Sequence, residues 1–159
     1  GIPSSILKEQ ASPFGADIMV SELSGALLDY WVAMASEEWK TAHQMYPTMT
    51  LDPTFSGVEI REWSEGRFCM LVPNNPFRQE TQIFSPSTDW MHGGRIIDKM
   101  LISLDPPCYH PRGSKYWRAC KVQPDTDDIW WADGKTALIA AMRCHVNSVY
   151  GDTVPRNPK

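Results

Sequence analysis

Hydrophobic and polar residues alternate at helical spacing in two stretches of the chain. In the first, which Ser24 can cap, apolar side chains recur at i, i+4 and i+8. They are Leu27, Leu28, Trp31, Val32 and Ala35. The polar residues Asp29, Ser36, Glu37 and Glu38 are expected on the solvent face. This pattern predicts an amphipathic helix whose apolar stripe packs in the core.

A second amphipathic helix is predicted near the C-terminus. Thr136 can cap it, Gly151 can end it, and Pro155 forbids its continuation. Its apolar face is formed by Leu138, Ile139, Met142, Val146 and Val149.

The middle of the chain contains strand-like segments. Residues Val58 to Trp63 and Arg67 to Val72 flank Ser64-Glu65-Gly66, which suits a hairpin turn. Residues Ile96 to Leu104 and Tyr116 to Val122 also alternate, although Asp98 interrupts the apolar face of the former.

Together these elements predict an α+β fold of two amphipathic helices packed on a small, mainly antiparallel β-sheet with long irregular loops. A single domain is expected over residues 19–155, since Met19 reads like a natural start. Residues 1–18 are interpreted as a leader, from an expression tag or an upstream extension, and residues 156–159 as a tail.

Composition restricts the class of protein. A net charge of −4 over 159 residues makes nucleic-acid binding an unfavoured function, because phosphate neutralisation needs a concentrated basic surface. The basic run Arg112, Lys115, Arg118 and Lys121 is interpreted as solvated charge. No apolar stretch is long enough for a membrane span, and the four cysteines are widely spaced, so we expect reduced thiols and a cytoplasmic location.

No complete catalytic, cofactor or metal motif is present. Gly134-Lys135-Thr136 resembles only the end of a phosphate-binding loop, and an ordinary capped helix explains it better. Cys108-Tyr109-His110 and Cys144-His145 are poorly spaced for zinc. We therefore expect no metal, no cofactor and no catalytic residues of a known type.

The most distinctive segment runs from Phe84 to Gly94. Thr88 and Asp89 can supply directional hydrogen bonds, Trp90 can stack on a planar group, and Gly93-Gly94 lets a ligand approach the backbone. The structural alternative is a turn closed by Thr88 and Asp89, with Trp90 in the core. Arg143, on the polar side of the last helix, completes the candidate ligand-binding set, where it would supply a cation if it faces this segment.

Three blocks of the sequence resemble the NinX-like family of lambdoid phage and prophage proteins, whose function is uncharacterised. The first runs from Val20 to Ala35, the second joins Ser87-Thr88-Asp89-Trp90 to Gly93-Gly94-Arg95-Ile96-Ile97-Asp98, and the third joins Thr136–Arg143 to Tyr150-Gly151-Asp152. Arg95 and Ala137 stand where the family pattern has proline. The resemblance implies an accessory gene of a temperate phage and supplies no catalytic residues.

The leading hypothesis is a non-enzymatic phage accessory protein that binds a host protein or a small nucleotide-like metabolite. The first alternative is a small hydrolase or transferase that uses Asp89 or His92 in the Thr88–Gly94 segment. The second is a protein–protein interaction module or homodimer that exposes Trp130 and Trp131.

Overall fold

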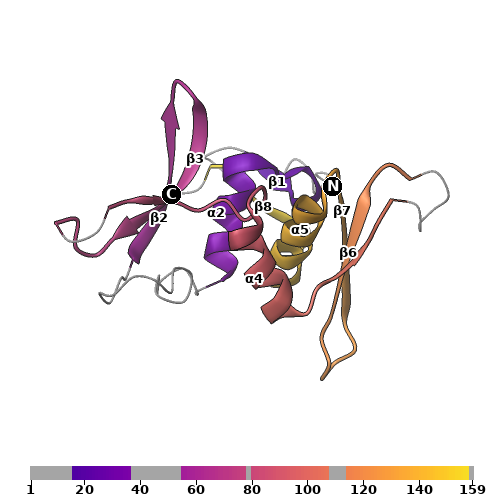
Figure 1. The fold of residues 1–159 in the computed structure, drawn as a ribbon. Helices are drawn as coiled ribbons and strands as arrows, with labels where there is room; N and C mark the ends of the chain where they lie inside the picture. Colours follow the sequence, from indigo (N-terminus) through magenta and orange to yellow (C-terminus); the bar gives the residue numbers. More distant parts are fainter. Residues whose placement is uncertain (1–15, 37–54, 78–79, 108–113, 158–159) are drawn as a thin grey trace, which may run out of the picture.

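The computed structural model describes residues 16–36, 55–77, 80–107 and 114–157 (Figure 1). Within these ranges the chain forms three α-helices, a short 3-10 helix and three small antiparallel sheets, which confirms the α+β class. The helices are η1 (Val20–Glu22), α2 (Gly25–Ala35), α4 (Trp90–Met100) and α5 (Ala137–Tyr150). In this part of the chain no helix combines the length and apolar character that a membrane crossing requires.

The strands form separate small sheets instead of the single expected one. The two-stranded sheet pairs β1 (Asp17–Met19) with β8 (Thr153–Pro155). The second has the order β2 (Phe55–Trp63), β3 (Gly66–Pro73) and β4 (Gln82–Ile83). The third has the order β5 (Ser103–Asp105), β6 (Trp117–Val122) and β7 (Ile129–Gly134). Strand β1 includes Asp17 and Ile18, which the sequence placed in the leader.

Two strand predictions are confirmed. Strands β2 and β3 form the expected hairpin, with Trp63 paired to Gly66 across the turn. Gly66 has a φ of +133°, which an L side chain rarely adopts, so glycine fits this exit from the turn. The strand predicted over Tyr116 to Val122 is β6.

Helix α2 confirms the first predicted helix, but its predicted solvent face is wrong. Asp29 and Ser36 are buried, at 5% and 6% exposure. The reason is that α2 packs against α5 and also against β2 and β3, so its polar side is covered as well. Glu37 and Glu38 lie outside the described residues.

The strand predicted over Ile96 to Leu104 is wrong. Residues up to Met100 belong to α4, and only Ser103–Asp105 form a strand. Ile96, Ile97 and Met100 are spaced i, i+1 and i+4, which suits one face of a helix as well as a short alternating run. Asp98 interrupted the strand pattern because it lies on the exposed side of α4.

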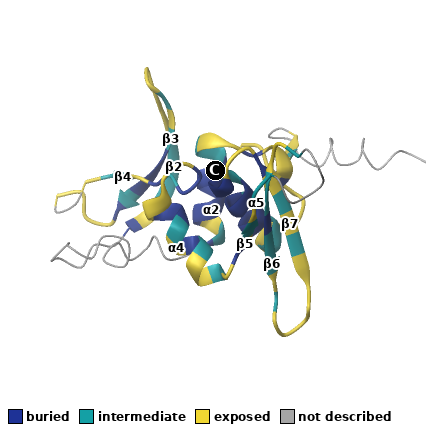
Figure 2. Ribbon diagram, turned by 45° about the vertical axis from the view of Figure 1, so that its right-hand side comes forward, coloured by how far each residue is buried: buried dark blue, intermediate teal, exposed yellow. Residues whose placement is uncertain are grey.

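Helix α5 confirms the second predicted helix and holds the core together. The Thr136 side chain accepts a hydrogen bond from the backbone N–H of Ile139 (3.1 Å), and Gly151 follows the last residue. The helix contacts α2, α4 and the β5–β6–β7 sheet. Figure 2 shows the buried residues concentrated along α2 and α5, with exposed residues at the ends of the β2–β3 and β6–β7 hairpins. Of the predicted apolar face only Val149 is exposed.

Candidate functional site

The segment from Thr88 to Gly94 forms the start of α4 and the turn before it. The backbone N–H groups of Thr88 and Asp89 both donate to the carbonyl of Ser85, which closes the turn. The Asp89 carboxylate accepts from the backbone N–H of Met91 (2.9 Å), so it caps α4. Thr88 is exposed and Trp90 is 57% exposed, so Trp90 does not enter the core.

The two glycines lie within helix α4 and have different roles. A Cβ on Gly93 would lie 2.3 Å from the carbonyl oxygen of Pro86 and 2.7 Å from a methyl carbon of Leu138. Gly93 therefore lets α4 pack closely on the preceding turn and on α5. A Cβ on Gly94 would meet only the Trp90 ring, at an ordinary 3.7 Å.

A buried carboxylate that the sequence pattern did not reveal anchors this turn. The Asp29 carboxylate of α2 accepts from the backbone N–H of Ser87 (2.8 Å). Burial raises the pKa of Asp29 to about 7, although the hydrogen bond to Ser87 opposes that rise. The turn before α4 is thus attached to the core through a group that is partly protonated near neutral pH.

His92, the proton carrier of the enzymatic alternative, is also built into this turn. It is 5% exposed, its Nδ1 accepts from the backbone N–H of Ser85 (3.0 Å), and its ring stacks on Phe84. Burial lowers the pKa of His92, which favours the neutral imidazole that this hydrogen bond requires. The ring therefore supports the turn from inside.

Arg143 lies at a different place from the Thr88–Gly94 segment. Its Nε donates to the backbone carbonyl of Leu23 and its Nη1 to the backbone carbonyl of Asp133, both at 2.8 Å. It lines a pocket to which none of the other predicted site residues contributes. The structure therefore divides the predicted set between the start of α4 and this pocket.

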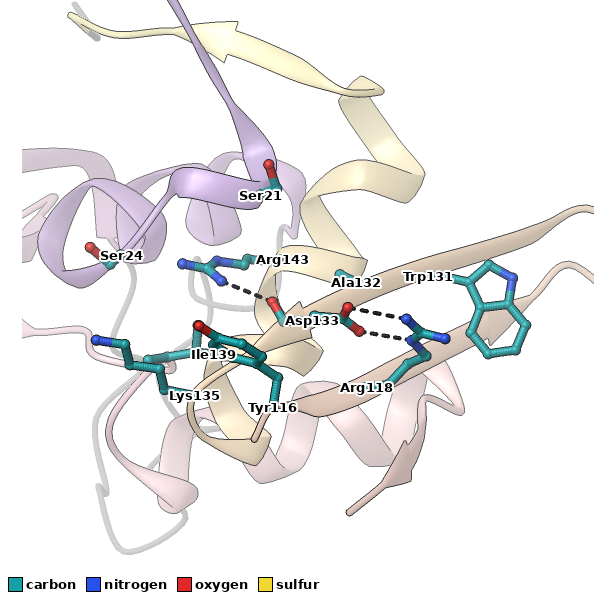
Figure 3. A pocket seen from close by; sticks show the side chains of 10 residues that line it. All are labelled: Ser21, Ser24, Tyr116, Arg118, Trp131, Ala132, Asp133, Lys135, Ile139 and Arg143. Carbon is teal, nitrogen blue, oxygen red and sulfur yellow. Dashed lines mark hydrogen bonds and ion pairs between the residues drawn. The ribbon is translucent and has the colours of Figure 1, made fainter. Parts of the chain in front are cut away.

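The pocket has a volume of about 680 Å³ and lies between η1, the β6–β7 hairpin and the first turns of α5 (Figure 3). Its size falls within the usual range for small-molecule sites. The side chains that line it are Ser21, Ser24, Tyr116, Arg118, Trp131, Ala132, Asp133, Lys135, Ile139 and Arg143.

Asp133 organises the two arginines of the pocket. Its carboxylate accepts from Nε and Nη2 of Arg118, its direct neighbour across the two strands, at 2.8 and 3.2 Å. Its backbone carbonyl holds Arg143 from the other side. Figure 3 shows the three side chains in a row, with Asp133 between the guanidinium groups. Each guanidinium has five N–H donors and these bonds use two of them, so three on each arginine have no hydrogen-bond partner among the described residues.

The charge of the pocket differs from that of the whole chain. Arg118, Lys135 and Arg143 supply three positive charges and Asp133 one negative charge, a net of +2 in a chain of net −4. Burial lowers the pKa of Arg143, but a guanidinium remains charged in proteins. Lys135 is exposed and immediately precedes the Thr136 cap at the start of α5.

Two exposed aromatic side chains accompany these charges. Trp131 is 53% exposed and Tyr116 is 49% exposed. The guanidinium carbon of Arg118 lies 5.9 Å from the centre of the Trp131 ring, within the range of a cation–π contact. The neighbouring Trp130 is half-buried and packs on the core, so the two tryptophans differ in role.

The cysteines and histidines offer no comparable site among the residues with described positions. There, no group of three His, Cys, Asp or Glu side chains is arranged to hold a metal ion. Cys69, Cys120 and Cys144 are free thiols, and burial raises the pKa of Cys144 to about 12, which disfavours the reactive thiolate. Cys108 and His110 lie outside the described ranges.

Most of the pocket was missed in the sequence analysis. Arg118 was interpreted there as solvated charge, and Trp131 as part of a protein interface. The available signal was the alternation of Trp131 and Asp133 in a strand opposite Arg118, but the strand over Ile129–Gly134 was not predicted.

Comparison with known proteins places the chain in a family. No curated protein matches it at a significant level. The family model described as Bacteriophage P22, NinX matches residues 19–148, which is most of the chain. The chain therefore belongs to the NinX family of bacteriophage P22.

Proposed function

We propose that this phage protein is a non-enzymatic accessory protein, and that it binds a small anionic molecule with a planar ring in the β6–β7 pocket. The observation that carries the proposal is the concentration of three cations and two exposed aromatic side chains in one cavity of an otherwise acidic chain. An anion would gain from the net positive charge, and a planar ring would gain from contact with Trp131 or Tyr116.

The Thr88–Gly94 segment supports a structural role better than a ligand site. Asp89 is engaged as the α4 cap, and the space beside Gly93 is occupied by Pro86 and Leu138. Thr88 and Trp90 remain exposed there, and the double substitution Thr88→Ala with Trp90→Ala is expected to leave ligand binding unchanged.

A macromolecular partner, either a host protein or a second copy of the chain, is the second candidate. Exposed apolar side chains on the outer face of β6 and β7 favour it, namely Val122, Ile129 and Trp131. Exposed aromatic residues are enriched in protein interfaces. Light scattering of the purified protein, together with Ile129→Ser, tests this candidate, and a monomer in both samples argues against self-association.

Native mass spectrometry is the first test of the small-molecule proposal. The protein is purified gently from its host, and its mass is measured before and after denaturation. Loss of a mass that corresponds to a bound anionic compound supports the proposal. Purified protein is then titrated by calorimetry with a nucleoside monophosphate, an aromatic carboxylate and a neutral nucleoside.

The variants Trp131→Ala and Lys135→Ala are each expected to weaken binding of the anionic probes about tenfold, the effect of losing one ring contact or one charge-assisted hydrogen bond. Arg67→Ala is the matched control, since Arg67 is an exposed cation of β3 outside the pocket. Failure of every anionic ring compound to bind, with no mass lost on denaturation, would refute the proposal.

A further inference from the structure

We infer that the ligand of the β6–β7 pocket is a phosphate monoester of a ring-bearing molecule, in chemical class a nucleoside monophosphate, with its phosphate bound by the remaining N–H donors of Arg118 and Arg143, beside the Asp133 carboxylate. This inference rests on the proposed function and specifies it. It follows from the way Asp133 holds the two guanidinium groups, from the net charge of the pocket and from the position of Trp131.

The two arginines are oriented before any ligand arrives. Asp133 fixes Arg118 through its carboxylate and Arg143 through its backbone carbonyl, and Leu23 holds Arg143 at a second point. Each side chain has therefore already lost much of its rotamer freedom, which lowers the entropic cost of binding. Asp133 is a positioning residue in this arrangement.

The remaining donors suit a tetrahedral group with three oxygens. A planar carboxylate can face one guanidinium fork in a bidentate manner, whereas a phosphate monoester presents three strong acceptor oxygens in different directions. Arg118 and Arg143 approach Asp133 from opposite sides and both line the pocket, so a ligand there meets a guanidinium group on either side of the Asp133 carboxylate. Lys135 adds a third cation on the same pocket.

Charge also separates the ligand classes. The charged groups that line the pocket, Arg118, Lys135, Arg143 and Asp133, sum to +2, and Asp105 of β5, the other strand neighbour of Arg118, acts on that guanidinium from outside the lining. A phosphate monoester carries about −1.5 to −2 at pH 7 because its second pKa is about 6. A phosphodiester or a carboxylate carries about −1 and would neutralise only about half of the net positive charge of the pocket lining.

The aromatic side chains place the ring of the ligand. Arg118 lies over the Trp131 ring at 5.9 Å, so a phosphate on Arg118 brings the remainder of the ligand beside the exposed indole. Stacking of a base on an aromatic side chain contributes about 1–3 kcal/mol in single-stranded nucleic-acid complexes. A nucleoside monophosphate combines the two recognised groups in one small molecule.

The test compares ligands that differ only at the phosphate. Adenosine and guanosine 5′-monophosphates, their 3′,5′-cyclic monophosphates, the free nucleosides and inorganic phosphate are titrated by calorimetry at pH 7.5. The 5′-monophosphates are expected to bind at least tenfold more tightly than each of the other probes. At pH 5, where about a tenth of the monoester is dianionic, their affinity should fall about tenfold, while that of the cyclic compounds stays constant.

The variant Arg118→Lys tests the fork geometry, because it keeps the charge of the pocket and removes the planar guanidinium. It is expected to weaken 5′-monophosphate binding about tenfold, whereas Arg67→Lys on β3 leaves it unchanged. Thermal unfolding of each variant confirms that the fold is intact.

The outcomes separate the two proposals. If a cyclic monophosphate or an aromatic carboxylate binds as tightly as the 5′-monophosphate, the monoester inference is wrong and the proposed function stands. If inorganic phosphate binds as tightly as the 5′-monophosphates, the ring of the ligand contributes nothing to binding, and the inference is also wrong. If no ring-bearing anion binds, the proposed function itself fails.

Discussion

The replacement of Asp29 by asparagine gives a sharp test of how the core is built. Asp29 is 5% exposed and accepts the backbone N–H of Ser87, and burial raises its pKa from 3.8 to about 7. Asparagine keeps the shape and an acceptor oxygen but carries no charge. The substitution therefore isolates the electrostatic cost of ionising a carboxyl group inside the protein.

The magnitude follows from the linkage between protonation and folding. A pKa raised by about three units corresponds to about 4 kcal/mol, at 1.36 kcal/mol per unit. The folded state binds a proton on Asp29 that the unfolded chain releases above pH 4. This contribution to stability is present at pH 4 and is lost as the pH rises through 7.

Another buried group has the opposite pH dependence, so the wild-type curve alone is not diagnostic. His145 is 1% exposed, and burial lowers its pKa from 6.5 to about 4. Its contribution is lost as the pH falls from 6.5 towards 4 and amounts to about 3 kcal/mol. The two terms largely cancel, and only the difference between wild type and Asp29→Asn isolates the carboxyl group.

The assay is urea denaturation of both proteins at pH 4, 5.5, 7 and 8.5. At pH 4 the two free energies of unfolding are expected to agree within about 1 kcal/mol, and at pH 8.5 the variant is expected to be more stable by up to about 4 kcal/mol. Asp125→Asn, at an exposed carboxylate, is the control. A difference between wild type and Asp29→Asn that does not change with pH would refute the reasoning.

Three further predictions concern the helices and the core. Because no described residue hydrogen-bonds either ring nitrogen of His145, His145→Leu should raise the free energy of unfolding, and by more at pH 5 than at pH 7 in urea titrations. Gly93→Ala should cost about 1–3 kcal/mol through overpacking, whereas Gly94→Ala should be neutral or stabilise by up to about 1 kcal/mol; equal melting temperatures for both would contradict this. Asp89→Ala should cost about 1 kcal/mol in the same thermal assay and Ser24→Ala less, because the Asp89 side chain makes a capping hydrogen bond and that of Ser24 does not.

The helices that the sequence predicted correctly are those with a long apolar face. Helix α5 has a capping threonine, a regular apolar face and a terminal glycine, and each of these local signals agrees with the others. Helix α4 lacks that agreement, because Gly93 and Gly94 weaken its helix propensity and the apolar run after them is short. Its cap, Asp89, was visible in the sequence but was interpreted as a ligand or turn residue.

The burial of polar side chains could not be predicted from the sequence, because it depends on tertiary packing. On a helix with one covered side, the apolar pattern of α2 would place Asp29 on the side that faces solvent. The packing of α2 against β2 and β3 as well as α5 comes from tertiary contacts. The same applies to His145, which follows Cys144 on α5 and is fully enclosed.

The pocket could not be assembled from the sequence because its parts are joined by register and by long-range contacts. Arg118 and Asp133 are 15 residues apart and become direct neighbours only when β6 and β7 pair. Trp131 is two positions from Asp133 and so lies diagonally opposite Arg118 on the same face. Arg143 joins them through a hydrogen bond to the backbone carbonyl of Asp133, and a second hydrogen bond holds it to Leu23, 120 residues away.

These placements change which part of the molecule is available to a ligand. The polar groups near the start of α4 already make hydrogen bonds within the protein, since Asp89 caps the helix and His92 accepts the backbone N–H of Ser85. The guanidinium groups of Arg118 and Arg143 are only partly engaged, since three N–H donors on each have no partner in the part of the chain that the structure describes. A group that is oriented by the fold and still has unsatisfied donors is ready to bind an anion at little entropic cost. By this reasoning the binding hypothesis belongs to the β6–β7 pocket, and the distinctive Phe84–Gly94 segment is a structural support, which is attached to α2 through Ser87 and Asp29 and packs α4 on α5 at Gly93.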